Sequence, residues 1–397
     1  MKKNNKTPKL RFSGYTDDWE QRKFSELYVR SSEKNDGSIG MDKNITVATM
    51  QFKEDVQVST AEYLKTYYTF NLGDIAFEGH QSKEFRYGRF VENDIGNGIV
   101  SHIFAVFRPI QEYDLYFWKY AINNETLMQR ILGRSTKAST MMHDLVANDF
   151  LNETFLVPSI DEQKQIGSLF NKLDHLITLH LRKLEKLQNM KKSCLQKMFP
   201  KDGATVPEIR FSEFQGDWEE RTLGSCFDER LESLPDGELL SVTIGSGIKK
   251  FSELDRHDNS NTDKSKYKRV CIGDIAYNST RMWQGASGRS PYEGIVSPAY
   301  TVVKPIGDID TQFFAYMFKK KEIIHLFEIN SQGLTSDTWN LKYPAFSKIV
   351  VRVPRNVEEQ SRIARFLLEL DELISCTEQE IEITKRMKKG CLQKMFV

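Results

Sequence analysis

The sequence predicts an α+β fold in which two similar mixed α/β domains are joined by two long antiparallel coiled-coil helices, with a pseudo-two-fold internal repeat. Three observations lead to this prediction. A ten-residue segment returns at the end of the 397-residue chain, half a chain length later. Each half begins with short apolar runs that are typical of strands, and each half ends with apolar residues recurring every three or four positions.

The repeated segment defines the repeating unit. Residues 190–199 and 387–396 share nine of ten residues, and their offset of about 200 residues is half the chain. Shorter matches keep the same order and nearly the same offset: Arg11-Phe12-Ser13 with Arg210-Phe211-Ser212, Asp18-Trp19-Glu20 with Asp217-Trp218-Glu219, Gly73-Asp74-Ile75-Ala76 with Gly273-Asp274-Ile275-Ala276, Gly88-Arg89 with Gly288-Arg289, and Gly98-Ile99-Val100-Ser101 with Gly294-Ile295-Val296-Ser297. The chain is therefore predicted to be two copies of one unit.

Composition narrows the class of protein. The sequence is 39% hydrophobic and 28% charged, and it contains no apolar run of roughly 18 residues that would predict a transmembrane helix. Residues 1–8 are basic and polar, which is unlike a secretory signal, so we expect a cytoplasmic protein. The net charge of +1 neither requires nor excludes nucleic acid as a partner, because local patches matter more than the total.

The cysteines and histidines give no sign of a metal site. The five cysteines form no C-x-x-C pair and no zinc-type spacing, and the seven histidines have no metal-ligand spacing. We expect reduced, buried thiols, and we interpret His102 and His143 as structural or surface residues.

The mixed regions are punctuated by Gly, Asn, Asp and Ser, as expected for short strands joined by turns. One or two helices are expected within each region, around 113–132 and 311–329. The expected strand segments are 45–47, 75–77, 99–106 and 154–157 in the first half, and 239–244, 270–277, 295–303 and 349–353 in the second.

The helical regions follow a proline in both copies. After Pro158, Ser159 is the expected N-cap, and after Pro354 the expected N-cap is Asn356. Pro200 ends the first helix. The apolar positions are Ile166, Leu169, Phe170, Leu173, Leu176, Ile177, Leu181, Leu184, Leu187, Cys194 and Met198 in the first helix, and Ile363, Phe366, Leu367, Leu370, Leu373, Ile374, Ile381, Met387, Cys391 and Met395 in the second.

Connectivity restricts how these parts are arranged. The second mixed domain follows the end of the first helix and precedes the beginning of the second helix. One compact domain meets both ends if the helices lie antiparallel along an apolar seam. We therefore expect a first domain over 1–155, a first helix over 156–200, a second domain over 201–353 and a second helix over 354–397.

Two similar heads related by a two-fold axis suggest a reader of duplex DNA. Dimeric DNA-binding proteins place their two readers about 34–36 Å apart per helical turn, in keeping with the symmetry of DNA. Here the two copies have diverged between the matched islands. The sequence therefore predicts recognition of two different half-sites separated by bases that are not read.

The chain resembles the specificity subunit of type I restriction–modification systems over nearly its whole length. The resemblance rests on the duplicated Asp-Trp-Glu and Gly-Asp-Ile segments, on the Val-Pro…Glu-Gln beginning of each helix (157–163; 353–360), and on Cys-Leu-Gln-Lys-Met-Phe at each helix end. It implies that the heads are target recognition domains binding a bipartite, asymmetric double-stranded DNA site. It also implies docking of two methyltransferase (modification) subunits and, through them, restriction subunits, with no catalytic activity in this chain.

Motifs for catalysis are missing, in agreement with a non-enzyme that needs no cofactor. There is no phosphate-binding G-x-x-x-x-G-K-[ST] loop and no Asn-Pro-Pro-aromatic or Asp-Pro-Pro-aromatic motif of the kind adenine methyltransferases use. Two alternatives remain: a coiled-coil adaptor with two protein-binding heads, and a repressor-like DNA-binding protein that acts alone.

The first candidate DNA contacts follow each Gly-Asp-Ile-Ala segment, over 78–89 and 278–289. Arginine is suited to reading guanine, glutamine is suited to reading adenine, and glycine allows close approach. Gln81, Arg86, Arg281 and Gln284 are the predicted base readers; Lys83, Tyr87, Arg89, Trp283 and Arg289 complete the set. The Gly-Arg shared by both copies fits phosphate contact or structure better, since a common contact cannot encode two sequences. A solvated loop is the alternative.

The second candidate segments precede the last expected strand of each head, over 134–140 and 331–336. Lys137, Thr140, Gln332 and Thr335 are predicted phosphate contacts there, although a capped turn explains the same residues. Lysines near both long-helix ends fit either DNA contact or the helix dipole, which favours cations there by about 0.3–1 kcal/mol. Trp19 and Trp218 are expected to anchor the cores of their heads.

Overall fold

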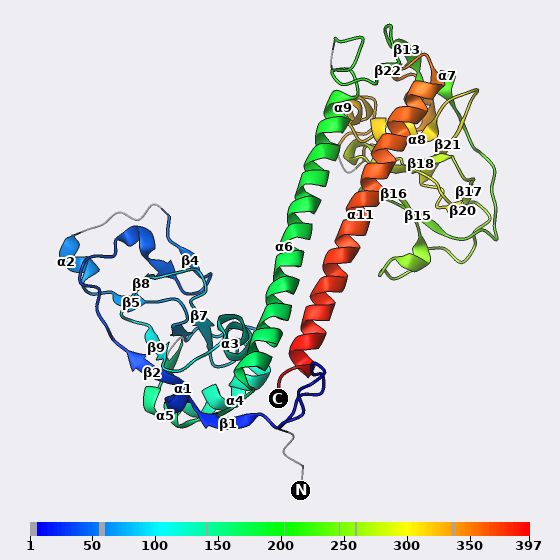
Figure 1. Cartoon of the computed structure of the whole chain (residues 1–397). Helices are drawn as coiled ribbons and strands as arrows, with labels where there is room; N and C mark the ends of the chain where they lie inside the picture. Colours follow the sequence, from blue (N-terminus) through cyan, green and yellow to red (C-terminus); the bar gives the residue numbers. More distant parts are fainter. Residues whose placement is uncertain are drawn as a thin grey trace. The chain divides into compact units, whose positions relative to one another are not determined.

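The computed structural model describes residues 6–54, 60–139, 142–201, 203–245, 247–258, 260–335 and 338–397. The chain divides into two compact units, Met1–Leu181 with Gln379–Val397, and Arg182–Glu378 (Figure 1). Both boundaries fall inside the long helices α6 (Ile160–Lys197) and α11 (Val357–Lys394). Each unit therefore contains one head and part of both helices. We call the residues before α6 head 1, and those between α6 and α11 head 2.

Head 1 is built on a four-stranded antiparallel sheet with the strand order β2-β9-β6-β7. Four further strand pairs surround it: β1 with β12, β3 with β4, β5 with β8, and β10 with β11. The strands are β1 Glu20–Lys23, β2 Tyr28–Ser31, β3 Ile45–Thr46, β4 Gln51–Phe52, β5 Tyr68–Phe70, β6 Ile75–Glu78, β7 Arg89–Glu92, β8 Gly98–Val100, β9 Ala105–Pro109, β10 Thr136–Ala138, β11 His143–Leu145 and β12 Thr154–Val157. The helices are α1 Phe24–Leu27, η1 Met41–Lys43, α2 Ala61–Leu64, α3 Leu115–Ile122, α4 Glu125–Ser135 and α5 Ala147–Asn152.

Head 2 repeats this plan, with the four-stranded order β14-β21-β18-β19. Its other pairs are β13 with β22, β15 with β16, and β17 with β20. The strands are β13 Glu219–Thr222, β14 Phe227–Glu229, β15 Leu240–Thr243, β16 Gly247–Lys250, β17 Lys268–Val270, β18 Ile275–Asn278, β19 Ser287–Arg289, β20 Gly294–Val296, β21 Tyr300–Pro305 and β22 Val350–Val353. The helices are α7 Leu223–Cys226, η2 Phe251–Glu253, η3 Met282–Gln284, α8 Thr311–Met317, α9 Lys321–Ile329 and α10 Tyr343–Phe346.

Three predicted strand segments were too long. Each of 99–106, 270–277 and 295–303 forms two strands separated by a turn. In 270–277 the turn contains Gly273, whose φ of 93° lies in the left-handed region that glycine adopts without steric cost. The residues Ser101-His102, Gly273-Asp274 and Ser297-Pro298 mark these changes of direction in the sequence. The expected helical regions 113–132 and 311–329 each form two helices, within the range predicted.

The long helices begin where the sequence placed them. Glu162 N donates to Ser159 Oγ at 3.4 Å, and Glu358 N donates to Asn356 Oδ1 at 2.8 Å, so both expected N-caps are confirmed. No helix among the described residues is long and apolar enough to cross a membrane.

Within unit 1, segments of α6 and α11 run antiparallel. Lys388 Nζ bonds Asp174 Oδ1 at 2.6 Å, and His180 Nδ1 lies 2.9 Å from Glu380 Oε2, so positions rise along α6 as they fall along α11. Within unit 2, an ion pair joins Lys191 of α6 to Asp371 of α11. The apolar seam between α6 and α11 is narrower than the predicted set of apolar positions. Four of its apolar residues are 41–56% exposed: Leu176, Leu181, Leu373 and Met387.

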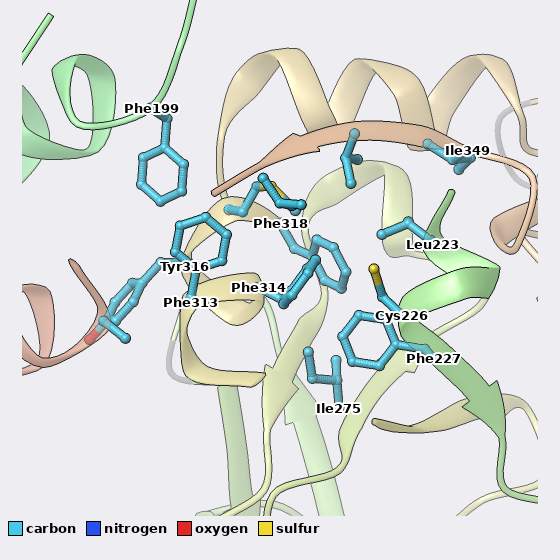
Figure 2. Packing of buried hydrophobic residues seen from close by; sticks show 14 of the residues in the cluster. Phe199, Leu223, Cys226, Phe227, Ile275, Phe313, Phe314, Tyr316, Phe318 and Ile349 are labelled. Atoms are coloured by element: carbon cyan, nitrogen blue, oxygen red, sulfur yellow. The ribbon is translucent and has the colours of Figure 1, made fainter. Parts of the chain in front are cut away.

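The Met-Phe end of the repeated segment belongs to a head core. Met198 and Phe199 lie in the core of head 2, where the Phe199 and Phe313 rings stack at 5.2 Å between centroids (Figure 2). Met395 and Phe396 lie in the core of head 1, and Phe396 is 5.6 Å from Phe117. Met395 and Phe396 thus complete the core of the first head.

The other repeated motifs also support the fold. Arg11 binds Glu162 through Nε at 2.7 Å and Nη2 at 2.8 Å, and Trp19 Nε1 donates to the same carboxylate at 3.2 Å. Arg210, Glu359 and Trp218 repeat this arrangement in unit 2. Trp19 and Trp218 are 2% and 3% exposed, as expected of core anchors. These part-buried ion pairs tie each head to the first turn of its long helix.

A second duplicated cluster explains one lysine of the repeat. In unit 1, Tyr120 Oη donates to Asp174 Oδ2 at 2.5 Å, and Lys388 Nζ bonds the other oxygen of that carboxylate. Tyr316, Asp371 and Lys191 form the equivalent cluster in unit 2. Burial, together with the neighbouring carboxylate, raises the pKa of both tyrosines above the ordinary value. These lysines therefore bind within the protein as well as lying near a helix C-terminus.

Candidate nucleic-acid interface

The two candidate segments of head 1 meet. His143 N donates to Gly79 O at 2.9 Å, which places the loop 79–88 beside the pair β10–β11. Gln81 Nε2 and His143 Nε2 are 2.6 Å apart. A cavity of about 400 Å³ lies beside this junction, and its lining includes His80 and His102. Two segments that the sequence analysis treated separately therefore form one surface.

Head 2 makes the same junction with different side chains. Leu341 N donates to Ser279 O at 2.9 Å, which places the loop 279–286 beside residues 338–341, and Gln332 N donates to Asn340 O at 3.1 Å. Trp283 and Trp339 meet edge to face at 5.3 Å between ring centroids. The backbone connection is thus shared between the heads, whereas the side chains around it differ.

The predicted contacts of head 1 fall into two groups. Gln81, Lys83, Arg86 and Lys137 are exposed, and Arg86 lies over the Tyr87 ring at 5.4 Å. Arg89 is half-buried: its Nε donates to Glu78 Oε2 at 2.8 Å and its Nη2 donates to Ala48 O at 2.7 Å. The structure thus gives Arg89 internal partners. Tyr87 is half-buried against His143, with 5.4 Å between ring centroids. Thr140 lies outside the described residues.

In head 2, Arg281, Gln332 and Thr335 are exposed, and Trp283 and Gln284 are half-buried. Arg289 is half-buried, and its Nε donates to Thr311 Oγ1 at 3.0 Å. The exposed residues lie on the two segments that the Ser279–Leu341 hydrogen bond brings together, although that bond does not by itself place each side chain at one site.

The sequence match between the two Gly-Arg pairs is not a structural equivalence. Ile75 of β6 pairs with Glu92, whereas Ile275 of β18 pairs with Arg289. Arg289 therefore occupies the register position of Glu92, not that of Arg89. The two arginines are therefore not equivalent in register, because the loop between these strands is shorter in head 2, and a phosphate contact by either one stays a prediction.

Lys319, which supports the surface of head 2, was not among the residues singled out from the sequence. Lys319 Nζ donates to Gly285 O at 2.6 Å, Ser287 O at 2.8 Å and Ile244 O at 3.0 Å. Burial, with a smaller effect of Lys191, lowers the pKa of Lys319 to about 8. Lys319 thereby holds the end of the loop 279–286. His143, interpreted from the sequence as a structural or surface residue, joins two segments of head 1. No motif marks either residue, because their partners are distant in sequence.

Comparison with known proteins relates part of this chain to one family. Residues 216–385, which cover most of head 2 and most of α11, match the family model described as type I restriction modification DNA specificity domain. A curated relative, the type I restriction enzyme MjaVIII specificity subunit from Methanocaldococcus jannaschii, is 26% identical over 139 residues. That match covers 33% of this chain and 32% of the relative, so the chain spans about a third of its length.

The fold has a solved counterpart. The type I restriction-modification system S subunit from M. genitalium aligns over 98% of this chain and 99% of its own, with a TM-score of 0.57 and 15% identity. The α+β fold class predicted from the sequence is confirmed. The family resemblance is confirmed for the part of the chain that the family model covers: residues 216–385 match the DNA specificity domain of type I restriction–modification systems.

Proposed function

We propose that this chain is the DNA-recognition subunit of a type I restriction–modification complex and binds a bipartite, asymmetric site on double-stranded DNA. The main support is the junction of two loops in each head, built on the same backbone hydrogen bond and carrying different side chains (Gln81 and His143; Trp283 and Trp339). Base edges are distinguished by such side chains, whereas a shared backbone frame carries no sequence information.

The chain is proposed to be non-catalytic and to hold two methyltransferase subunits, with restriction subunits joining through them. The duplicated helix pair offers each unit the same arrangement, including the Tyr120–Asp174–Lys388 cluster and its counterpart in unit 2. Repeated surfaces suit two copies of one partner. Methylation and cleavage would belong to those partners, which would also take the target base out of the stack.

The functional modules are proposed to follow the predicted limits, with recognition domains over 1–155 and 201–353 and helices over 156–200 and 354–397. Both helix-start ion pairs, Arg11–Glu162 and Arg210–Glu359, would be retained by exchanging a head together with the first turn of its helix.

Single-molecule sequencing of methylated bases tests the proposed function. A host carrying this gene and its modification subunits should methylate a two-part motif that is lost when the gene is removed. Exchanging head 1 for that of a relative should alter one half of the motif. An unchanged methylation pattern without the gene refutes the function. A change in both halves after the exchange refutes the modular assignment.

Binding to duplex DNA at increasing salt separates this function from a protein-binding adaptor. Contacts to phosphates release counterions, so the affinity should fall steeply as the salt concentration rises. Co-purification with a methyltransferase subunit distinguishes the proposed subunit from a repressor that acts alone.

A further inference from the structure

A series of hydrogen bonds connects the backbone of α4 in head 1 to the candidate base reader Gln81. Thr136 Oγ1 donates to Leu132 O at 2.7 Å, His143 Nδ1 lies 3.4 Å from that Oγ1, and His143 Nε2 lies 2.6 Å from Gln81 Nε2. His143 is 9% exposed, whereas Gln81 is exposed. The imidazole therefore lies between a fixed backbone carbonyl and a surface amide.

The direction of each bond follows from counting hydrogens. A threonine hydroxyl has one hydrogen, which Thr136 uses on Leu132 O, so Thr136 Oγ1 accepts from His143. The proton of neutral His143 is then on Nδ1, and its Nε2 is an acceptor. Only the amide nitrogen of Gln81 satisfies that acceptor. One N–H of the Gln81 amide is thus bonded to His143, which fixes the orientation of the amide and leaves its Oε1 and second N–H for another partner.

We propose that neutral His143 is a positioning residue that holds the Gln81 amide in the orientation needed to read an adenine. This inference rests on the proposed function. Adenine offers N7 as acceptor and the N6 amino group as donor, which an amide N–H and Oε1 match together. A freely rotating amide can exchange the places of its N–H donor and its Oε1 acceptor, whereas the fixed Gln81 amide presents the two groups to the base in one orientation.

The other head lacks this device. Leu341 occupies the position of His143, since it makes the same backbone bond to Ser279 that His143 makes to Gly79. Leu341 is fully buried in the core of head 2. The histidine is therefore specific to one head, and the second half-site is an internal control in every measurement.

Nitrogen NMR on the full chain labelled with ¹⁵N-histidine tests the tautomer without DNA. The His143 signals, assigned by their loss in His143→Leu, should show a protonated Nδ1 and an unprotonated, hydrogen-bonded Nε2. Gln81→Ala should shift the Nε2 signal and leave Nδ1 nearly unchanged. A proton on Nε2, or an Nε2 signal indifferent to Gln81→Ala, overturns the inference and leaves the proposed function untouched.

Sequencing of methylated bases tests the reading role in the complex with its modification subunits. His143→Leu should weaken the preference for adenine at one position of one half-site by about 5- to 150-fold. His143→Gln, whose Oε1 accepts close to where Nε2 does, should restore it. Lys83→Ala, in the same loop, should lower affinity without changing base preference. Unaltered preference in His143→Leu, or equal loosening of both half-sites, overturns the reading role. If no DNA methylation depends on this chain, the proposed function itself is refuted.

Discussion

Truncating the side chain of Phe396, the penultimate residue, should destabilise the first head of the protein. Phe396 is 7% exposed. The centroid of its ring lies 5.6 Å from that of Phe117, 5.8 Å from that of Phe170 and 6.4 Å from that of Trp19. Phe396→Ala removes these contacts and leaves a cavity among rigid rings. Core substitutions of this kind cost about 3–5 kcal/mol.

The expected loss should be visible in two measurements. For units of this size, about 3 kcal/mol lowers Tm by roughly 6–12 °C. Hydrogen exchange should rise in β6 (Ile75–Glu78), while β18 (Ile275–Asn278) keeps its protection. Phe199→Ala should produce the opposite pattern because Phe199 belongs to the core of head 2. Phe396→Leu, which retains most of the volume, should cost less than about 1.5 kcal/mol.

One result would refute this reasoning. If Phe396→Ala increases exchange in the last turn of α11 but leaves β6 unchanged, the end of the chain is not part of the core of head 1. Equal losses in both heads would show that the two cores unfold as one cooperative unit.

Other substitutions test other parts of the structure. Glu92 is 2% exposed without a hydrogen-bond partner among the described residues, and burial, assisted by Asp94, raises its pKa. Because the folded protein holds the Glu92 proton more tightly than the unfolded chain does, the free energy of unfolding should fall as the pH rises above about 4.5. In urea unfolding, Glu92→Met should remove that decline and add about 1–3 kcal/mol at pH 7. If the dependence of stability on pH is the same in Glu92→Met as in the unchanged protein, this prediction is wrong. Leu370→Asp places a carboxylate in the core of head 2 and should lower the free energy of unfolding by more than about 4 kcal/mol. The amides of β18 should then lose their protection against hydrogen exchange, and β18 amides that stay protected would contradict this prediction. Arg281→Ala should relax methylation specificity in one half-site by about 1–3 kcal/mol, and an intact motif removes Arg281 from the readers.

Much of the fold followed from periodicity and punctuation. The long helices were predicted because an apolar spacing of three and four persists over many turns, and their starts were predicted because Ser159 and Asn356 satisfy backbone N–H groups locally. Strand limits were less accurate. The segment 99–106, predicted as one strand, contains a turn that begins at the polar residues Ser101-His102.

The candidate interface was predicted only in part. The loops after β6 and β18 were chosen for their residue types, and whether they contact DNA is still a prediction. That each loop joins the second candidate segment depends on hydrogen bonds between residues far apart in sequence, Gly79 with His143 and Ser279 with Leu341. The match of Arg89 with Arg289 failed because sequence alignment cannot fix strand register across loops of unequal length.

The sequence by itself determined that the chain is duplicated, because the repeated segment ending in Met-Phe needs no structure to be seen. It also determined the helix starts and the family, which depend on local capping and on short ordered motifs. Tertiary structure alone decided what the repeat does: Phe199 and Phe396 fill head cores, and Lys191 and Lys388 bind Asp371 and Asp174. Such roles depend on packing between distant segments, which burial and geometry establish only after the chain has folded.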